Sequence, residues 1–153
     1  WVASRVFTEH SFPWQMKLAV NGTPFPIDDR RGIPKMIFKG TLEHFSEDTL
    51  ARFRRRMCGS SGQTEEFLSR TPTRTAEELR EELAALAQGI TAYGSSSFIW
   101  DRAIIGNRDK IFPPRNQHEA WQGTEIMETE AEHYETSLFS RLLEGKGEEW
   151  TRH

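Results

Sequence analysis

The order of apolar and polar residues predicts short β-strands near the start of the chain. Within residues 14–20, Met16, Leu18 and Val20 occupy alternate positions, which is the period of a strand with one buried face. Residues 2–7 and 35–39 are short stretches of mostly apolar residues that favour two further strands. The dipeptide Asn21-Gly22 is typical of a two-residue hairpin turn, because both residue types accept positive φ. These patterns predict an antiparallel arrangement.

Helical periodicity begins after this region. Ser46 is a suitable N-cap and is followed by two acidic residues, which the positive end of a helix dipole favours. Leu50, Phe53 and Met57 then recur at the spacing of one helix face, so a helix is predicted from Ser46 to about Met57. A joint rich in Gly and Ser and a short helix over residues 64–70 are expected to follow.

The clearest helix signal in the sequence begins at Thr75. Thr75 and Glu78 have the spacing of a capping box, in which each side chain satisfies a free backbone donor. The apolar residues that follow recur on one helix face as far as Ile90. Either Gly89 or Gly94 is a suitable C-terminal end for this helix.

The last third of the chain is harder to interpret. Residues 98–105 fit a strand or a buried helical turn, and periodicity does not choose between them. Residues 107–123 contain two adjacent prolines and predict a long surface connection. A final helix is predicted over residues 124–144. Its apolar face would consist of Met127, Ala131, Tyr134, Leu138 and Leu142.

Together these elements predict an α+β fold, with a small N-terminal antiparallel sheet of about three strands followed by three to four helices. We expect a single domain over residues 1–145, sheet-rich over 1–40 and helical over 41–145. Residues 146–153 are expected to form a flexible tail. No leader segment precedes Trp1, so we expect a domain that belongs to a larger protein.

Composition and charge narrow the classes of protein. The chain has 153 residues, of which 36% are hydrophobic and 11% aromatic, so it can bury a core and is not disordered. Its apolar runs are too short to span a bilayer, and no membrane partner is expected. A single cysteine, Cys58, favours a reducing, intracellular compartment, either cytoplasm or nucleus.

The net charge of −3 is divided unevenly along the chain. Residues 1–75 contain 12 Lys and Arg against 8 Asp and Glu, whereas residues 76–153 contain 8 against 15, so the halves carry +4 and −7. Such a distribution can steer a charged partner or drive self-association.

Arginines form the strongest local charge feature. Arg52, Arg55 and Arg56 fall on neighbouring positions of a helix end, and Arg70 and Arg74 follow. Arginine forks bind phosphates and carboxylates through paired hydrogen bonds, so these five residues are candidate contacts for nucleic acid or an acidic partner. Cations at a helix C-terminus also simply complement the helix dipole, which is the structural alternative.

No complete catalytic or metal-binding pattern is present. Glu130 and His133 have the spacing of half a dimetal helix motif, but no second half exists, so no metal or cofactor is expected. The catalytic residues are therefore unknown from sequence. An enzyme would have to draw its site from residues that meet only in the fold. The pool comprises His10, His44, His118, Glu119 and His133.

Two other local features invite a chemical interpretation. Asp28, Asp29 and Lys35 invite comparison with nucleases that use acids and a lysine around a divalent ion. Adjacent strand positions point to opposite faces, so the acidic pair is better explained as a charged turn. Cys58, near Arg56, could have a lowered thiol pKa, but no partner histidine is evident.

Two tryptophans are candidate anchors for a protein partner. Trp121 and Trp150 lie in polar surroundings near predicted loops and ends. Tryptophan is enriched among the residues that dominate protein interfaces. An isolated aromatic residue on a surface is also common and then has no function.

These observations favour a protein–protein interaction module from a larger intracellular protein, binding another protein or itself, and lean against an enzyme. The first alternative is a nucleic-acid-binding domain that uses the arginine-rich helix end. The second is an enzyme whose site is assembled only in the fold.

Overall fold

The computed structural model describes residues 1–70 and 73–145 of the chain. The structured elements in order are α1 (Val2–Glu9), β1 (Leu18–Val20), α2 (Lys35–Glu43), α3 (Glu47–Cys58), α4 (Ser61–Ser69), α5 (Ala76–Tyr93), β2 (Arg102–Gly106), α6 (Pro114–Ala120), β3 (Glu125–Thr129) and α7 (Thr136–Leu143). The expected flexible tail, residues 146–153, lies outside the described residues. None of the helices described is both long and apolar enough to cross a membrane.

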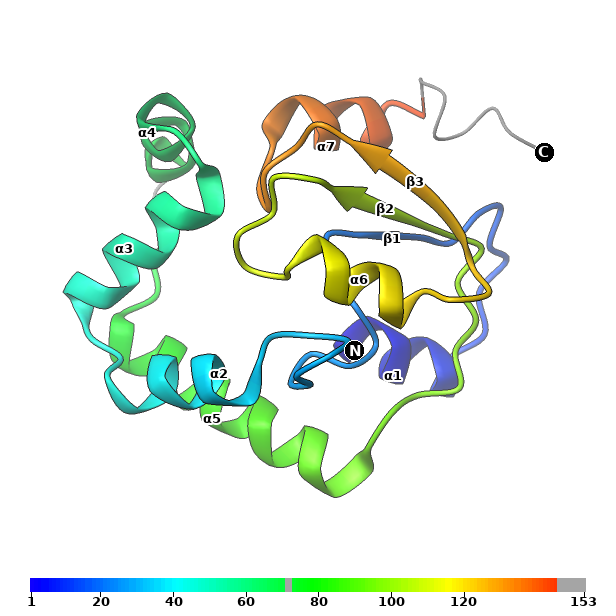
Figure 1. Cartoon of the computed structure of the whole chain (residues 1–153), viewed down its shortest axis with the longest axis horizontal. Helices are drawn as coiled ribbons and strands as arrows, with labels where there is room; N and C mark the ends of the chain where they lie inside the picture. The colour runs from blue at the N-terminus through cyan, green and yellow to red at the C-terminus, as the bar shows by residue number, and fades with distance from the viewer. Residues whose placement is uncertain (71–72, 146–153) are drawn as a thin grey trace.

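The three strands form one parallel sheet in the order β1-β2-β3. Strand β2 is central, and all five of its residues are buried. Its alternate residues face opposite ways, so Ile104 packs with residues of α7 while Ile105 packs with Trp121 at the end of α6. The sheet therefore lies between α6 and α7, as Figure 1 shows.

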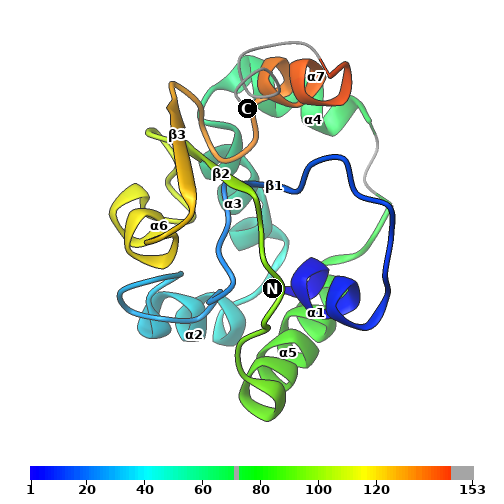
Figure 2. The ribbon, with the colours of Figure 1, turned by 90° about the vertical axis from the view of Figure 1, so that its right-hand side faces the viewer.

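Helices α2 to α5 connect β1 to β2 and form an arc beside the sheet (Figure 1). Helix α1 lies next to α5 (Figure 2), where the Trp1 indole donates a hydrogen bond to the Gly94 carbonyl at 2.6 Å. The other side of α1 contacts the chain before β2, where the Trp100 indole donates to the Ser4 hydroxyl at 2.9 Å.

The predicted antiparallel N-terminal sheet is wrong. Two of the three strands come from the last third of the chain, all three are parallel, and the structure has seven helices within the described residues rather than three to four. Asn21 does adopt positive φ, at 48°. The turn it begins is no hairpin, because the next strand is β2, far along the chain and parallel to β1.

Both other predicted N-terminal strands are helices. Residues 2–7 lie in α1 and residues 35–39 lie in α2. The α2 helix begins there because Asp29, in the polar loop before it, accepts a hydrogen bond from the Lys35 N–H at 2.9 Å. This carboxylate supplies the cap that a free helix end needs, and it lies six residues before the N–H that it binds.

The predicted helix over residues 124–144 is also wrong, because its first part is β3 and only residues 136–143 are helical. Met127, Ala131, Leu138 and Leu142 nevertheless pack in one core cluster beside Ile104, although they come from a strand, a loop and a helix. Two helix predictions are confirmed. Ser46 caps α3, and Thr75 with Glu78 forms the capping box of α5.

Candidate active site

A buried carboxylate lies just beyond the C-terminal end of the central strand. Asp109 follows Gly106, the last residue of β2, and its side chain is 0% exposed. The Asp109 N–H donates to the Gly106 carbonyl at 3.1 Å, which turns the chain back at the sheet edge. A charged group in this position is stable only when hydrogen bonds replace the water that it has lost.

Four donors surround the Asp109 carboxylate. Its Oδ1 accepts the N–H groups of Ile111 and Phe112 at 2.7 and 2.9 Å. Its Oδ2 accepts the side-chain amide of Gln117 at 3.1 Å and is 2.9 Å from Nδ1 of His133. Because each oxygen has two partners, the carboxylate is held in one orientation toward the imidazole.

His133 lies in the loop between β3 and α7, at the same edge of the sheet. Its ring stacks on Phe112, with centroids 5.9 Å apart and planes 15° from parallel. The side chain is 23% exposed, so one edge of the imidazole remains accessible. Asp109 binds this ring at Nδ1 and Phe112 stacks on its face.

The two loops that carry this pair are also joined by opposite charges. Arg108 and Lys110 flank Asp109, and Glu132 precedes His133. Glu132 carboxylate oxygens lie 3.7 Å from Arg108 Nε and 3.6 Å from Lys110 Nζ. The Tyr134 N–H donates to the Met57 carbonyl at 3.1 Å, which anchors the histidine loop to the end of α3.

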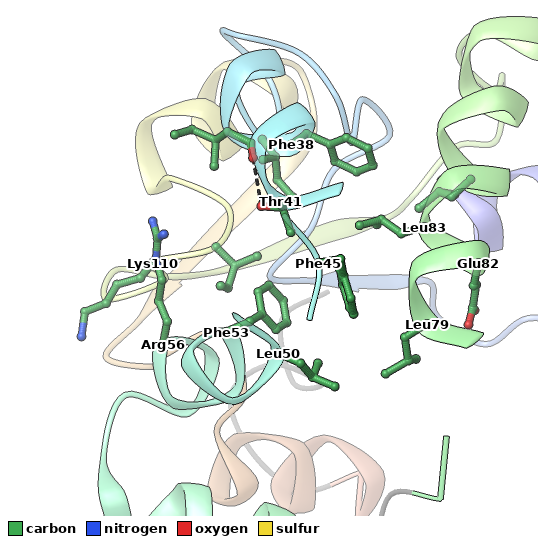
Figure 3. A pocket seen from close by; sticks show the side chains of 14 residues that line it. Phe38, Thr41, Phe45, Leu50, Phe53, Arg56, Leu79, Glu82, Leu83 and Lys110 are labelled. Atoms are coloured by element: carbon green, nitrogen blue, oxygen red, sulfur yellow. Dashed lines mark hydrogen bonds between the residues drawn. The ribbon is translucent and has the colours of Figure 1, made fainter. Parts of the chain in front are cut away.

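An apolar pocket of about 350 Å³ lies among α2, α3 and α5 and reaches the loop that follows Asp109. Figure 3 shows side chains of α2, α3 and α5, such as Phe38, Phe53 and Leu83, pointing into it. Lys110 and Ile111, the two residues after Asp109, line it as well. Arg56, Glu82 and Lys110 are the charged residues of this lining, so the pocket suits an apolar chain with a polar end.

The residues that the sequence offered for an enzyme site included His133 but not its partner, Asp109. Among the other pool members, His118 Nε2 lies 3.3 Å from Glu128, and Glu119 pairs with Arg30 at 2.6 Å. The His44 ring bonds the Gly40 carbonyl at 3.0 Å. His10 packs edge-on against Phe12. None of these four contacts involves Asp109 or His133.

Asp109 and Gln117 lie within residues 107–123, which the sequence predicted to be a surface connection, so neither was singled out as a candidate. The signal that could have found Asp109 is its position shortly after the buried apolar run at residues 103–105. In sheets with parallel strands, functional groups gather beyond the carboxyl ends of the strands. That rule needs the parallel pairing, which the local pattern did not reveal.

The predicted arginine contacts lie on the helical arc. Arg52, Arg55 and Arg56 are exposed on α3, and Arg56 also lines the pocket. Arg70 pairs with Glu66 at 3.3 Å, and Arg74 pairs with Glu82. The first three are therefore exposed cations on α3, of which Arg56 lies at the pocket, whereas the last two have acidic partners of their own.

Trp121 and Trp150 were the two predicted anchors for a protein partner. Trp121 is 5% exposed and its indole donates to the Gly22 carbonyl at 3.0 Å, so it belongs to the core rather than to an exposed surface. Trp150 lies outside the described residues.

The other candidate chemical groups are structural. Asp28 accepts the N–H groups of Arg30 and Arg31, both at 2.9 Å, which confirms the charged turn. Burial raises the pKa of the Cys58 thiol, although a hydrogen bond with the Thr64 side chain acts in the opposite direction. A lowered thiol pKa at Cys58 is therefore wrong.

Glu130 and His133 are not on a helix, and Glu130 instead binds Arg108. Within the part of the chain that the structure describes, no group of three or more His, Cys, Asp and Glu could hold a metal ion.

The chain matches known proteins over nearly its whole length. The family model described as pimeloyl-ACP methyl esterase BioG matches residues 1–144. A malonyl-[acyl-carrier protein] O-methyltransferase of Bacteroides fragilis is 47% identical over 145 residues, which are 94% of this chain and 30% of that protein. An uncharacterized protein of Haemophilus influenzae is 42% identical over 142 residues, covering 92% of this chain and 65% of that protein.

The fold is also that of a solved relative. The crystal structure of BioG from Haemophilus influenzae superimposes with a TM-score of 0.81 at 41% identity, covering 90% of this chain and 64% of that one. The chain thus spans less than two thirds of the length of these relatives.

These matches overturn the expectation of an interaction module, and with it the nucleic-acid alternative, because the family is described as one of enzymes. An aspartate and a histidine do converge at the sheet edge, which is the arrangement that the second alternative, a site assembled only in the fold, requires. The chain belongs to the BioG family, described as pimeloyl-ACP methyl esterase.

Proposed function

We propose that the protein containing this chain is a carboxylic ester hydrolase in which Asp109 and His133 form the acid–base half of a catalytic triad. The observation that carries the proposal is the 2.9 Å contact between Asp109 Oδ2 and His133 Nδ1 at the carboxyl edge of a parallel sheet. In α/β-hydrolases the triad residues follow one another in the order nucleophile, Asp or Glu, His. Asp109 precedes His133 here, in agreement with that order.

The nucleophile in this proposal is a serine hydroxyl from a part of the protein that precedes Asp109. The sequence of this chain contains no Gly-x-Ser-x-Gly elbow, the motif that presents such a serine. Since the relatives are longer than this chain, we place the serine outside it.

The geometry supports the following chemistry. The Nδ1–H group of His133 donates to Asp109, which holds the tautomer that leaves Nε2 as a base. Nε2 takes the proton from the serine hydroxyl as its oxygen attacks the ester carbonyl, and returns it to the departing methanol. Water then attacks the acyl-enzyme, again losing its proton to Nε2, and the free carboxylic acid and the serine are regenerated.

The family description names pimeloyl-ACP methyl ester as substrate, and we propose the same substrate class for this protein. The apolar pocket, which Lys110 and Ile111 of the Asp109 loop help to line, suits the hydrocarbon part of such an acyl chain. The methyltransferase description belongs to a protein of which the match covers 30%. An Asp–His pair transfers protons to and from oxygen atoms, as ester hydrolysis requires, which favours hydrolysis over methyl transfer.

We further propose that the exposed arginines of α3 contact acidic groups of the carrier protein that the family description names. Arg52, Arg55 and Arg56 are exposed and have no ion-pair partner among the described residues, and Arg56 lines the pocket into which the acyl chain would extend. Arg70 and Arg74 stay weaker candidates because they pair with Glu66 and Glu82. An intracellular location, expected from the single cysteine, is part of this proposal.

Methanol release from pimeloyl-ACP methyl ester by the full-length protein tests the hydrolase proposal. We expect the wild type to release methanol and His133→Ala to lose about 10³-fold or more in kcat. The matched control is His118→Ala, because His118 also faces a carboxylate but on the surface, with Glu128. A wild type without hydrolysis, or an equal loss in both variants, contradicts the proposal.

A further inference from the structure

Asn21 connects the ends of two strands with the loop that carries His133. It follows Val20, the last residue of β1, and is 3% exposed. We propose that Asn21 is a positioning residue that holds the His133 loop at the distance from β2 which the Asp109–His133 contact requires. The inference rests on the proposed function of that pair, and it concerns a residue outside the pair.

Three hydrogen bonds use the Asn21 amide. Oδ1 accepts the Gly106 N–H at 2.7 Å, at the end of β2. Nδ2 donates to the carbonyl of Glu132 at 2.9 Å and to the carbonyl of His133 at 3.0 Å. One acceptor and two donors are needed at once, and the asparagine side chain supplies both kinds of group.

The backbone of Asn21 makes this reach possible. Its N–H donates to the Ile104 carbonyl at 3.0 Å and so continues the pairing of β1 with β2. Its φ of 48° then turns the side chain across the strand ends, a conformation that asparagine accepts more easily than most residues. The Asn21-Gly22 dipeptide therefore serves as a brace between segments rather than as a hairpin turn.

The space at the end of β2 is shaped for this contact. A Cβ atom on Gly106 would lie 2.9 Å from Asn21 Oδ1 and 2.5 Å from the Ala131 carbonyl oxygen. The absence of a side chain at Gly106 thus lets the amide of Asn21 and the chain before His133 approach the strand end together.

The loops that carry Asp109 and His133 are also linked by the ion pairs of Glu132 with Arg108 and Lys110, at 3.7 and 3.6 Å. Arg108 and Lys110 are half exposed, and ion pairs of exposed groups contribute little to structure. The Asn21 bonds are short and shielded from water. They join the carbonyl of His133 itself to the strand that leads to Asp109.

The test compares Asn21→Asp with Asn116→Asp in the full-length protein. The Asn21 change keeps the shape and the tolerance of positive φ but removes both donors. Asn116 is a matched control, because it is also 3% exposed and its Nδ2 also donates to two carbonyls, those of Asp29 and Gly32. Asn21→Gly, which also accepts positive φ, provides a second variant if the aspartate variant does not fold.

Two readouts separate positioning from general stability. The first is the division of the effect between kcat and KM for hydrolysis of the methyl ester. A small displacement of a catalytic group costs on the order of 10²-fold in rate. We expect about that loss in kcat for Asn21→Asp, with KM little changed, and kcat close to the wild type for folded Asn116→Asp.

The second readout is the downfield proton NMR signal of the Nδ1–H group that His133 shares with Asp109, identified by its loss in His133→Ala. We expect this signal to shift or broaden in Asn21→Asp and to persist in Asn116→Asp. It requires no turnover, so a wild type that hydrolyses no ester would contradict the proposed function while the signal still tests the role of Asn21. An unchanged kcat and an unchanged signal in both Asn21 variants, or the same changes in Asn116→Asp, overturn the inference.

Discussion

The side-chain amide of Gln117 donates a hydrogen bond to Oδ2 of Asp109, the oxygen atom that also faces the imidazole of His133. Gln117 is on α6, is fully buried, and donates a second bond to the Phe112 carbonyl at 2.8 Å. This one residue therefore holds both the carboxylate and the loop residue on which the imidazole stacks.

We expect Gln117→Met to lower the free energy of unfolding by about 1–3 kcal/mol, because Asp109 loses a donor and the Phe112 carbonyl loses its partner. The matched control is Gln122→Met, since Gln122 is exposed and bonds Glu119 on the surface. That control should change the free energy of unfolding by no more than about 0.5 kcal/mol. Urea denaturation measures both, and equal values would contradict the supporting role of Gln117.

Asp109→Asn should lower kcat for ester hydrolysis by about 10⁴-fold while the protein remains folded. The amide can present an N–H where the carboxylate accepted one, so Nδ1 of His133 becomes the acceptor and Nε2 carries the proton. Steady-state kinetics with a circular dichroism spectrum of each protein measures this. Asp101→Asn is the control, because Asp101 lies before β2 and pairs with Lys17 at 3.1 Å. Retention of activity in Asp109→Asn would remove Asp109 from the triad.

Two glycine-to-alanine substitutions are expected to change stability in opposite directions. One tests the close packing at Gly106, at the end of β2, and the other is at Gly40, inside α2. Gly106→Ala should destabilise the protein by more than about 1 kcal/mol, because its Cβ would meet the Ala131 carbonyl oxygen at 2.5 Å. Gly40→Ala should stabilise it by about 0.5–1 kcal/mol, because Gly40 is inside α2 and a Cβ there meets no atom within 4 Å. Thermal unfolding measures whether each variant is more or less stable than the wild type. A Gly106→Ala variant as stable as the wild type would contradict the close approach of the Ala131 carbonyl to Gly106.

Asp28 is expected to make folding sensitive to acid. Burial alone would raise its pKa, but hydrogen bonds from the Arg30 and Arg31 N–H groups and the charge of Arg31 lower it below its ordinary value. A lowered pKa stabilises the fold above about pH 4, and this contribution is lost as the pH falls through the value in the folded protein.

Asp28→Asn should therefore be less stable than the wild type at pH 7, and this difference should shrink at about pH 2. The midpoint of urea denaturation at both pH values measures it. A difference of the same size at both would show that the charge of Asp28 does not contribute.

The sequence by itself determined the features that rest on neighbouring residues. Ser46 caps α3 and Thr75 with Glu78 caps α5, because each side chain reaches a backbone N–H three residues away whatever the rest of the protein does. The positive φ of Asn21 follows from the same local chemistry. Four of the five apolar residues predicted for the last segment, all but Tyr134, do pack in one core cluster, although the single helix predicted for them is wrong.

Only the tertiary structure decided how distant segments pair. Leu18 aligns with Arg102 across the β1–β2 pair, and Arg102 aligns with Glu125 across the β2–β3 pair. No local period encodes such partners, because a strand exposes the same row of N–H and C=O groups to a parallel or an antiparallel neighbour. The pairing brings Asp109 and His133 to one sheet edge and puts Asn21 in contact with both the end of β2 and the His133 loop. Chemistry that depends on groups 24 and 112 residues apart in the chain therefore became visible only in the fold.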